Sequence, residues 1–274
     1  MSELGFRLRP ANPQTRPCKV CGGVSRPFGA TDFNRNCEEI RGNFLPPSGI
    51  EVPYRRCEAC GLVYTEAFDD WTHADFEAHI YNADYGQVDA DYADIRPANG
   101  AAFIGKLFGA SKDGLAVLDY GGGSGVMAAR LREAGFADVV TYDAFHPDHR
   151  ERPDRRFDLV TCFETLEHMP DPVGGAADIA SFLTDDGLLV FSTLTQPADF
   201  DAQGLGWWYV GPRNGHVTLH THKSLAILWA RHQRSVGSFN ANLHAAYGAV
   251  PAFARHVIGP QTPRDARTRD AAEP

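Results

Sequence analysis

Short apolar runs alternate with amphipathic stretches along most of the chain after residue 98. The apolar runs, each short enough to be one buried strand, lie at 115–120, 138–142, 157–162 and 187–194. The stretches with apolar residues at helical spacing lie at 98–109, 126–134, 173–183 and 223–232. A last strand is expected within 235–243. Strands that alternate with helices predict a mostly parallel, doubly wound α/β sheet, whose ligands bind beyond the carboxyl ends of the strands.

Charge divides the chain into unlike parts. Residues 1–60 carry nine basic and six acidic side chains, whereas residues 61–100 carry one basic and nine acidic ones. The acidic segment is rich in Trp and Tyr, which predicts short helices packed by their aromatic rings. The predicted parts are a small module at 1–70, an acidic aromatic connector at 71–97, a main domain at 98–258 and a disordered tail at 259–274.

Composition excludes several classes of function. The chain has 26 basic and 35 acidic residues, a net charge of −9, which argues against nucleic-acid partners and anionic membranes. It holds no apolar run of about 18 residues, so no membrane-spanning helix is expected. The start, MSELGFRLRP, lacks the apolar core of a secretory signal. We therefore expect a cytoplasmic protein without structural disulfides.

Four of the six cysteines form two C-x-x-C pairs, each followed by glycine. They are Cys18, Cys21, Cys57 and Cys60. Four thiolates complete a closed tetrahedral Zn²⁺ site, so we predict structural zinc, with unpaired core cysteines or a redox pair as the alternatives. The interval between the pairs exceeds that of the usual zinc ribbon, so 22–56 should form an inserted loop or hairpin. Cys37, inside this insertion, is expected to be spare.

The segment VLDYGGGSG at 117–125 carries the strongest signal for a ligand. Its glycines allow a sharp turn and a close approach of the backbone. Asp143 lies at the end of the next predicted strand after these glycines, where a carboxylate can accept hydrogen bonds from both hydroxyls of a ribose. This arrangement suits any adenosine-containing cofactor. A P-loop is excluded because no Gly-Lys-Ser/Thr follows the glycines.

Two motifs fit these glycines. Gly123, Gly125 and Ala128 match G-x-G-x-x-A, the dinucleotide fingerprint of an NAD-dependent oxidoreductase. Asp119, Gly121 and Gly123 match D-x-G-x-G, which resembles motif I of the class I S-adenosylmethionine (SAM)-dependent methyltransferases. RFDLVTCFETLEHMPDP at 156–172 resembles the strand-four segment of the branch that contains the ubiquinone-biosynthesis O-methyltransferases. The resemblance covers about residues 98–245.

The resemblance implies a Rossmann-like class I methyltransferase domain, preceded here by a small zinc-ribbon-like module, and SAM as the methyl donor. The glycines would border the methionine part of SAM, Asp143 would hold its ribose, and the residues after strand four would line it near the sulfonium. The cofactor-binding residues implied are Asp119, Gly121, Gly123, Gly125, Asp143, Phe163 and Glu164. The family usually inserts a helix and a third strand after the ribose acid, and the segment at 144–156 is too short for both.

The N-terminal segment VPYRRCEACGLVYT at 52–65 resembles the zinc-binding domain of bacterial sugar C-methyltransferases. The acceptor expected from both resemblances is a small molecule, such as a sugar, a glycan precursor or another secondary metabolite. An RNA methyltransferase with a zinc module is an alternative, against which the net charge and the lack of a basic stripe argue. An NAD-dependent oxidoreductase and a zinc-ribbon interaction module that has lost its activity also remain open.

In the methyltransferase family that the chain resembles, the region after strand 187–194 covers the acceptor. Here it contains an aromatic, glycine-punctuated loop whose residues 207–209 (WWY) would either stack on an acceptor or form a hydrophobic plug. His168 and His216 are the candidate general bases for an acceptor hydroxyl, with a packing role as the alternative for His216. His220 and His222 are expected to alternate on a strand and to be structural.

Overall fold

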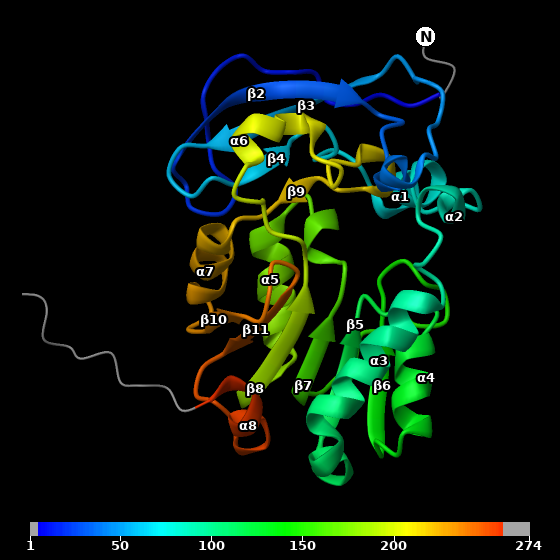
Figure 1. The fold of residues 1–274 in the computed structure, drawn as a ribbon, viewed down its shortest axis with the longest axis vertical. Coiled ribbons are helices and arrows are strands. Elements are labelled where there is room, and N and C mark those ends of the chain that lie inside the picture. Colours follow the sequence, from blue (N-terminus) through cyan, green and yellow to red (C-terminus); the bar gives the residue numbers. More distant parts are fainter. Residues whose placement is uncertain (1–4, 260–274) are drawn as a thin grey trace, which may run out of the picture.

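The computed structural model describes residues 5–259, which form two sheets (Figure 1). The larger sheet has the strand order β10-β11-β8-β7-β5-β6. Its strands are β5 (Ala116–Tyr120), β6 (Asp138–Tyr142), β7 (Phe157–Cys162), β8 (Leu183–Ser192), β10 (Ser235–Ser238) and β11 (Leu243–Tyr247). The four strands β6, β5, β7 and β8 are parallel, and the hairpin of β10 and β11 adds antiparallel strands beside β8. The predicted doubly wound α/β sheet is confirmed.

Helices cover both faces of this sheet, as a parallel sheet requires. Neighbouring residues of one strand point to opposite faces: Val117 packs with the cluster under one pair of helices, and Leu118 with the cluster under the other. The first pair is α3 (Ile95–Phe108) and α4 (Val126–Glu133). The second pair is α5 (Pro172–Ser181) and α7 (His222–Ala230). The short helix α8 (Arg255–Ile258) adds its partly buried side chains to the first cluster.

Two predictions near the end of the chain need correction. A strand does lie within 235–243, namely β10, but it is not the last one. The Asn240 side chain accepts hydrogen bonds from the backbone N–H groups of Asn242 and Leu243 and so closes a turn, after which β11 pairs with β10. His222 begins α7 and does not lie on a strand, because Thr221 and Ser224 form a capping box at that point. The prediction for 144–156 is confirmed, since these residues form neither a helix nor a strand.

The smaller sheet is antiparallel and has the order β1-β2-β3-β4-β9. Its strands are β1 (Arg16–Pro17), β2 (Val24–Asp32), β3 (Glu51–Cys57), β4 (Val63–Thr65) and β9 (Thr218–Leu219). The insertion at 22–56 is confirmed as a hairpin of β2 and β3, with a short 3-10 helix at Cys37–Arg41 in its loop. Strand β9 comes after β8 in the chain and pairs with β4, so two distant parts of the chain share this sheet.

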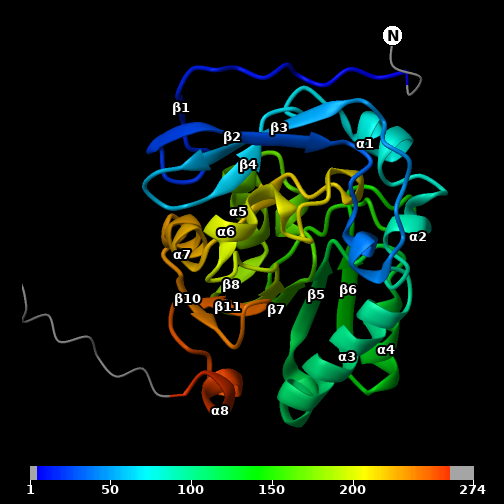
Figure 2. The same cartoon turned by 45° about the horizontal axis from the view of Figure 1, so that its top comes forward.

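The smaller sheet lies beyond the end of the larger sheet to which β7 and β8 point (Figure 1), and Figure 2 shows the molecule with this end turned toward the viewer. The residues of the predicted connector form α1 (His73–His79) and α2 (Tyr85–Val88) beside it, and α6 (Phe200–Gln203) lies against β2 and β3. Trp71 packs edge-on against Phe76 with ring centroids 5.2 Å apart, which confirms short helices held by aromatic rings. The N-terminal sheet thus covers the carboxyl ends of the strands, where ligands of such sheets bind.

The predicted tail at 259–274 lies outside the described residues, apart from Gly259. Among residues 5–259, none of the helices has the length and apolar content needed to cross a bilayer.

Candidate functional site

The glycine-rich turn joins β5 to α4 at the covered end of the sheet. Gly121, Gly123 and Gly125 all have positive φ angles of 53° to 78°, the left-handed region that favours glycine. The Gly121 N–H donates to the Tyr142 carbonyl oxygen at 2.7 Å, which ties the turn to the end of β6. A Cβ atom on Gly121 would lie 2.5 Å from Thr165 Oγ1, whereas one on Gly123 would meet nothing within 4 Å. The open side of the turn is therefore at Gly123.

Asp143 lies beside this open side. Its Oδ2 accepts a hydrogen bond from the Gly123 N–H at 2.8 Å, and its Oδ1 accepts from the N–H groups of Phe145 and His146 at 2.8 and 3.1 Å. Each carboxylate oxygen has two lone-pair sites, so Oδ1 is fully used and Oδ2 can still accept one hydroxyl. The structure thus brings the predicted ribose acid and the predicted glycine turn into direct contact. Phe145 packs against Tyr81, with ring centroids 5.2 Å apart.

Asp119 lies beneath the turn. A Cβ atom on Gly122 would come within 2.2 Å of Asp119 Oδ2, so the carboxylate lies directly under the backbone there. Thr161 Oγ1 donates to Oδ1 at 3.3 Å, and Oδ2 has no hydrogen-bond partner among the described residues. Burial raises the pKa of Asp119 to about 7. Asp119 is therefore placed to support the turn from below.

This raised pKa predicts a pH-dependent gain in stability for Asp119→Asn. An ordinary aspartate has a pKa of about 3.9 in the unfolded chain, so the folded protein binds the proton more tightly. The wild type therefore loses stability as pH rises from about 4 to about 7. The asparagine of Asp119→Asn does not ionise, so the variant has no such loss of stability. At pH 8 we expect Asp119→Asn to be more stable than wild type by at least about 1 kcal/mol, and at pH 5 the gap should narrow.

Urea unfolding at both pH values measures this difference. Asp186→Asn, at an exposed position, is the control and should change stability little at either pH. An Asp119→Asn variant that is less stable than wild type at pH 8 would contradict the burial argument.

Glu164 follows β7 in a left-handed conformation, with φ 48°. Its N–H donates to Ser192 Oγ at 2.8 Å, and the Ser192 hydroxyl donates back to Glu164 Oε1 at 2.6 Å, so β8 fixes the carboxylate. Arg96 Nη1 lies 3.7 Å from Oε2. Burial, with the Glu167 charge as a second cause, raises the pKa of Glu164 to about 7. The neighbouring Phe163 ring packs against α3, where a Cβ atom on Gly100 would lie 3.0 Å from it.

His168 and His216, predicted as bases, lie together. Their ring centroids are 4.9 Å apart, although the two residues are distant in the chain. Burial lowers the pKa of His168 to about 4 and that of His216 well below its ordinary value, so both rings are neutral at pH 7. The sequence had assigned no role to Glu167, which is fully buried beside them and accepts a hydrogen bond from the Tyr209 hydroxyl at 2.6 Å.

The aromatic residues 207–209 divide between two environments. Trp207 and Tyr209 are buried in the cluster under the smaller sheet, whereas Trp208 keeps 39% of its surface exposed. Trp207 packs edge-on against Phe200, with ring centroids 5.6 Å apart. Of the two roles considered for residues 207–209, the structure therefore favours a hydrophobic plug over acceptor stacking for Trp207 and Tyr209.

The four paired cysteines form one cluster, and none is in a disulfide. The Sγ atoms of Cys18 and Cys60 are 3.7 Å apart, and those of Cys21 and Cys57 are 3.4 Å apart. Thiolates about 2.3 Å from a tetrahedral Zn²⁺ would be roughly 3.8 Å apart, so these separations suit the ion. Backbone N–H groups also point at three of the four sulfurs, as in zinc knuckles.

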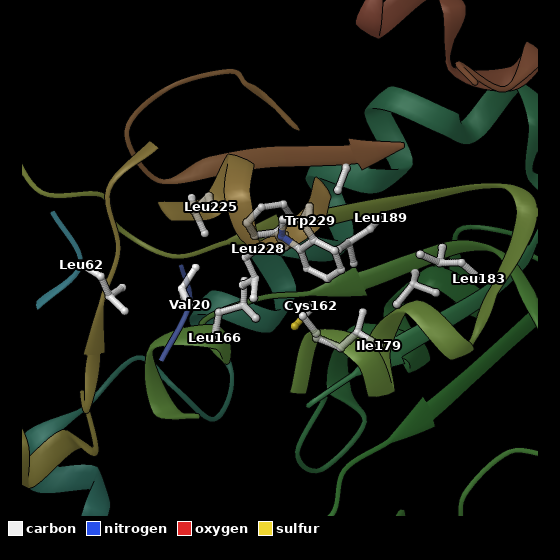
Figure 3. Packing of buried hydrophobic residues seen from close by; sticks show 14 of the residues in the cluster. Val20, Leu62, Cys162, Leu166, Ile179, Leu183, Leu189, Leu225, Leu228 and Trp229 are labelled. Carbon is white, nitrogen blue, oxygen red and sulfur yellow. The ribbon is translucent and has the colours of Figure 1, made fainter. Parts of the chain in front are cut away.

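The cysteine cluster is part of a core shared with the larger sheet. Figure 3 shows Val20, from the first knuckle, beside Leu166, Leu225 and Leu228. Leu62, which follows the second knuckle, belongs to the same cluster of buried side chains. The N-terminal module is therefore packed on α7 and on the segment after β7.

Residues 92–234, just over half of the chain, match the family model described as "Methyltransferase domain". The chain belongs to this methyltransferase family. The fold, with its glycine-rich turn after β5 and the acid after β6, is that of the class I methyltransferases. The matched region contains the turn, Asp143, His168 and His216, but not the four paired cysteines.

Curated relatives of this methyltransferase include ubiquinone biosynthesis O-methyltransferases. That of Hydrogenovibrio crunogenus is 30% identical over 103 residues, which are 29% of this chain and 43% of the relative. That of Aliivibrio fischeri (strain MJ11) is 31% identical over 107 residues, or 30% of this chain and 45% of the relative. The chain thus matches less than half the length of these relatives.

Solved structures are more distant. The magnesium protoporphyrin IX methyltransferase of Synechocystis, solved with bound SAH, is 17% identical, with a TM-score of 0.42 over 56% of this chain and 82% of that one. The plantazolicin methyltransferase, solved with a monoazolic desmethylPZN analog and SAH, is 13% identical, with a TM-score of 0.44 over 62% of this chain and 92% of that one.

Proposed function

We propose that this methyltransferase uses SAM to methylate a hydroxyl group of a small molecule, such as a sugar, a glycan precursor or another secondary metabolite. The contact between Asp143 and the open side of the turn at Gly123 carries the proposal. It provides a carboxylate for ribose beside a backbone that a ligand can approach closely. Relatives named O-methyltransferases support oxygen as the atom methylated.

The residues present fit SAM as the donor. Gly121 and Gly123 would border its methionine part, and Asp143 Oδ2 would accept a hydrogen bond from a ribose hydroxyl. Phe163 and Glu164 follow the neighbouring strand β7, where an aromatic ring and a carboxylate suit a sulfonium cation. The donor is activated by its own positive charge, so the protein has mainly to align the acceptor and exclude water. The N-terminal sheet above the strand ends is suited to exclude water.

The cysteine cluster is proposed to hold one structural Zn²⁺. Four thiolates leave no open coordination position, so the ion would stabilise the N-terminal module without taking part in methyl transfer. Cys37 lies outside the cluster, with its Sγ 3.6 Å from His216 Nδ1. The net charge of −9 argues against nucleic acid as the acceptor.

Asp143→Ala tests the donor site. Loss of a charge-assisted hydrogen bond should cost about 1.5–3 kcal/mol, so SAM should bind roughly 10- to 150-fold more weakly. Isothermal titration calorimetry measures the affinity for SAM and, in a separate titration, the affinity for NAD. Asp148→Ala, at an exposed position of the same loop, is the matched control and should bind SAM as wild type does. Unchanged SAM affinity in Asp143→Ala would place the ribose elsewhere, and preferential binding of NAD would favour an oxidoreductase instead.

A further inference from the structure

One tyrosine beside the proposed site has a hydroxyl without a partner. Tyr81 lies between α1 and α2, beside the smaller sheet (Figure 1), and its hydroxyl makes no hydrogen bond to any residue of 5–259. The hydroxyls of Tyr54, Tyr85 and Tyr209, by contrast, each donate to an oxygen of the protein. Enclosed tyrosine hydroxyls usually have a partner. Tyr81 is only partly buried, so its hydroxyl is available to a ligand.

The Tyr81 hydroxyl lies between the proposed donor site and His168. A Cβ atom on Gly215 would come within 2.9 Å of Tyr81 Oη and 3.1 Å of His168 Nδ1, so these two atoms border the same point. His168 Nδ1 also has no hydrogen-bond partner among the described residues. The Tyr81 ring packs against Phe145, whose N–H donates to Asp143 Oδ1. Tyr81 thus connects the acid proposed to hold ribose with a histidine of the region proposed to bind the acceptor.

Two carboxylates influence this hydroxyl. Enclosure by the protein raises the pKa of Tyr81, and the charges of Glu167 and Asp143 raise it further. The hydroxyl therefore keeps its proton at neutral pH, so Tyr81 is not a base. Its oxygen has two lone pairs that no described residue uses. Such an oxygen can accept a hydrogen bond from a polarised, positively charged group.

The protein fixes the position of this oxygen. Arg213, which is buried, donates to the Ile80 carbonyl oxygen at 2.9 Å through Nη1 and to Asn82 Oδ1 at 3.2 Å through Nη2. The Tyr81 N–H donates to the Phe76 carbonyl oxygen at 2.9 Å. The chain is thus held on both sides of Tyr81. A dipole that is already fixed in place can stabilise a transition state without first having to reorient.

We propose that the Tyr81 hydroxyl oxygen contacts the methyl group of bound SAM and holds it in line with the acceptor. This inference rests on the proposed function. With the ribose at Asp143 and the sulfonium beside Glu164, the methyl group has to point toward the smaller sheet, because the acceptor is covered there. Tyr81 lies on that side. The sulfonium charge polarises the methyl C–H bonds, so they can donate weak hydrogen bonds to an oxygen.

The contact would align the methyl transfer and would take no proton. A bond forms between the acceptor oxygen and the methyl carbon as the carbon–sulfur bond breaks, and the electron pair of that bond stays on sulfur. The proton of the acceptor hydroxyl passes to water, and Tyr81 keeps its own proton. Because the contact restricts the direction of the methyl group, it favours the in-line geometry that the transition state requires.

Tyr81→Phe tests the contact by binding alone, with three ligands that differ at the methyl position. They are SAM, its demethylated product SAH, and sinefungin, in which a carbon atom bearing an amino group replaces the methylated sulfur. In Tyr81→Phe we expect SAM to bind roughly 2- to 5-fold more weakly, and SAH to bind as to wild type because it has no methyl group. Sinefungin should bind at least about tenfold more weakly, since its charged amino group would lose a full hydrogen bond. Isothermal titration calorimetry on the full-length, zinc-loaded protein measures all three affinities.

Tyr85→Phe is the matched control from the same segment. The Tyr85 hydroxyl donates to the Asn214 carbonyl oxygen at 3.3 Å, so its removal should lower the melting temperature and leave the three affinities as in wild type. Tyr81→Phe keeps the packed ring and loses no hydrogen bond to a described residue, so it should melt as wild type does. The two variants therefore separate a role in folding from a contact with the donor.

The three ligands also separate this inference from the proposed function. An equal loss of SAM and SAH affinity in Tyr81→Phe would place the hydroxyl against another part of the donor and overturn the methyl contact. Unchanged sinefungin affinity in Tyr81→Phe would overturn it as well. In both cases the donor site at Asp143 would stand. A wild type that binds none of the three ligands would overturn the proposed function itself.

Discussion

Cys57→Ser should release zinc and unfold the N-terminal sheet. Serine is not a thiolate ligand, and binding of structural Zn²⁺ contributes roughly 10–16 kcal/mol to the folding of small zinc modules, so the loss should exceed that of any ordinary point substitution. Cys57 is also the last residue of β3, in a core that continues into α7 through Leu225 and Trp229. Zinc content by atomic emission and thermal unfolding by circular dichroism measure the effect.

The loss of zinc in Cys57→Ser should impair the region proposed to bind the acceptor more than the region proposed to bind SAM. The Cys60 carbonyl oxygen accepts from Thr221 Oγ1 at 2.7 Å, and the Gly61 carbonyl oxygen accepts from Gln196 Nε2 at 2.9 Å. These bonds hold the loop that carries His216, so Cys57→Ser should reduce turnover more than SAM affinity. Cys37→Ser is the control, because Cys37 is outside the cluster, and it should keep its zinc. A Cys57→Ser protein with full zinc content would refute the four-thiolate site.

The sequence was sufficient for the features that depend on neighbouring residues. An apolar run ending in glycines predicted β5 and its turn, and the position of Asp143 after the next strand predicted its place beside Gly123. Each prediction needed only local patterns and the rule that parallel strands end at one edge. The four cysteines were grouped correctly for the same reason, since paired C-x-x-C spacing is itself a local signal.

The sequence was insufficient where distant segments meet. Strand β9 has only two residues, and nothing in its composition shows that it completes the N-terminal sheet beside β4. Glu167 stands next to His168 in the sequence, but its surroundings are formed by Tyr209 and His216. These two residues come from a loop that is distant in the chain.

The turn itself permits the sharpest test of the donor site, because two of its glycines differ in what surrounds them. Gly121→Ala should destabilise the protein and abolish SAM binding, since its Cβ atom would lie 2.5 Å from Thr165 Oγ1 and 2.9 Å from Thr165 Cγ2. Thr165 has little freedom to move, because its hydroxyl donates to the Phe163 carbonyl oxygen. Gly123→Ala has room for its Cβ atom and should lose only the roughly 1–2 kcal/mol of a left-handed alanine.

Gly123→Ala should nevertheless bind SAM far more weakly than wild type, because its methyl group would occupy the open side of the turn where the donor is proposed to lie. The two variants thus separate folding from binding. The melting temperature should fall mainly in Gly121→Ala, whereas SAM affinity measured by calorimetry should fall in both variants. Adding Thr165→Ala to Gly121→Ala removes both of the closest atoms and should restore the stability lost to the clash, which leaves the roughly 1–2 kcal/mol of a left-handed alanine. Gly105→Ala, on an open face of α3, is the control: it should bind SAM as wild type does and should be more stable by about 0.5–1 kcal/mol, since alanine favours a helix. Wild-type SAM affinity in Gly123→Ala would mean that the donor does not approach the turn from this side, and Asp143 would then have to be reassigned with it.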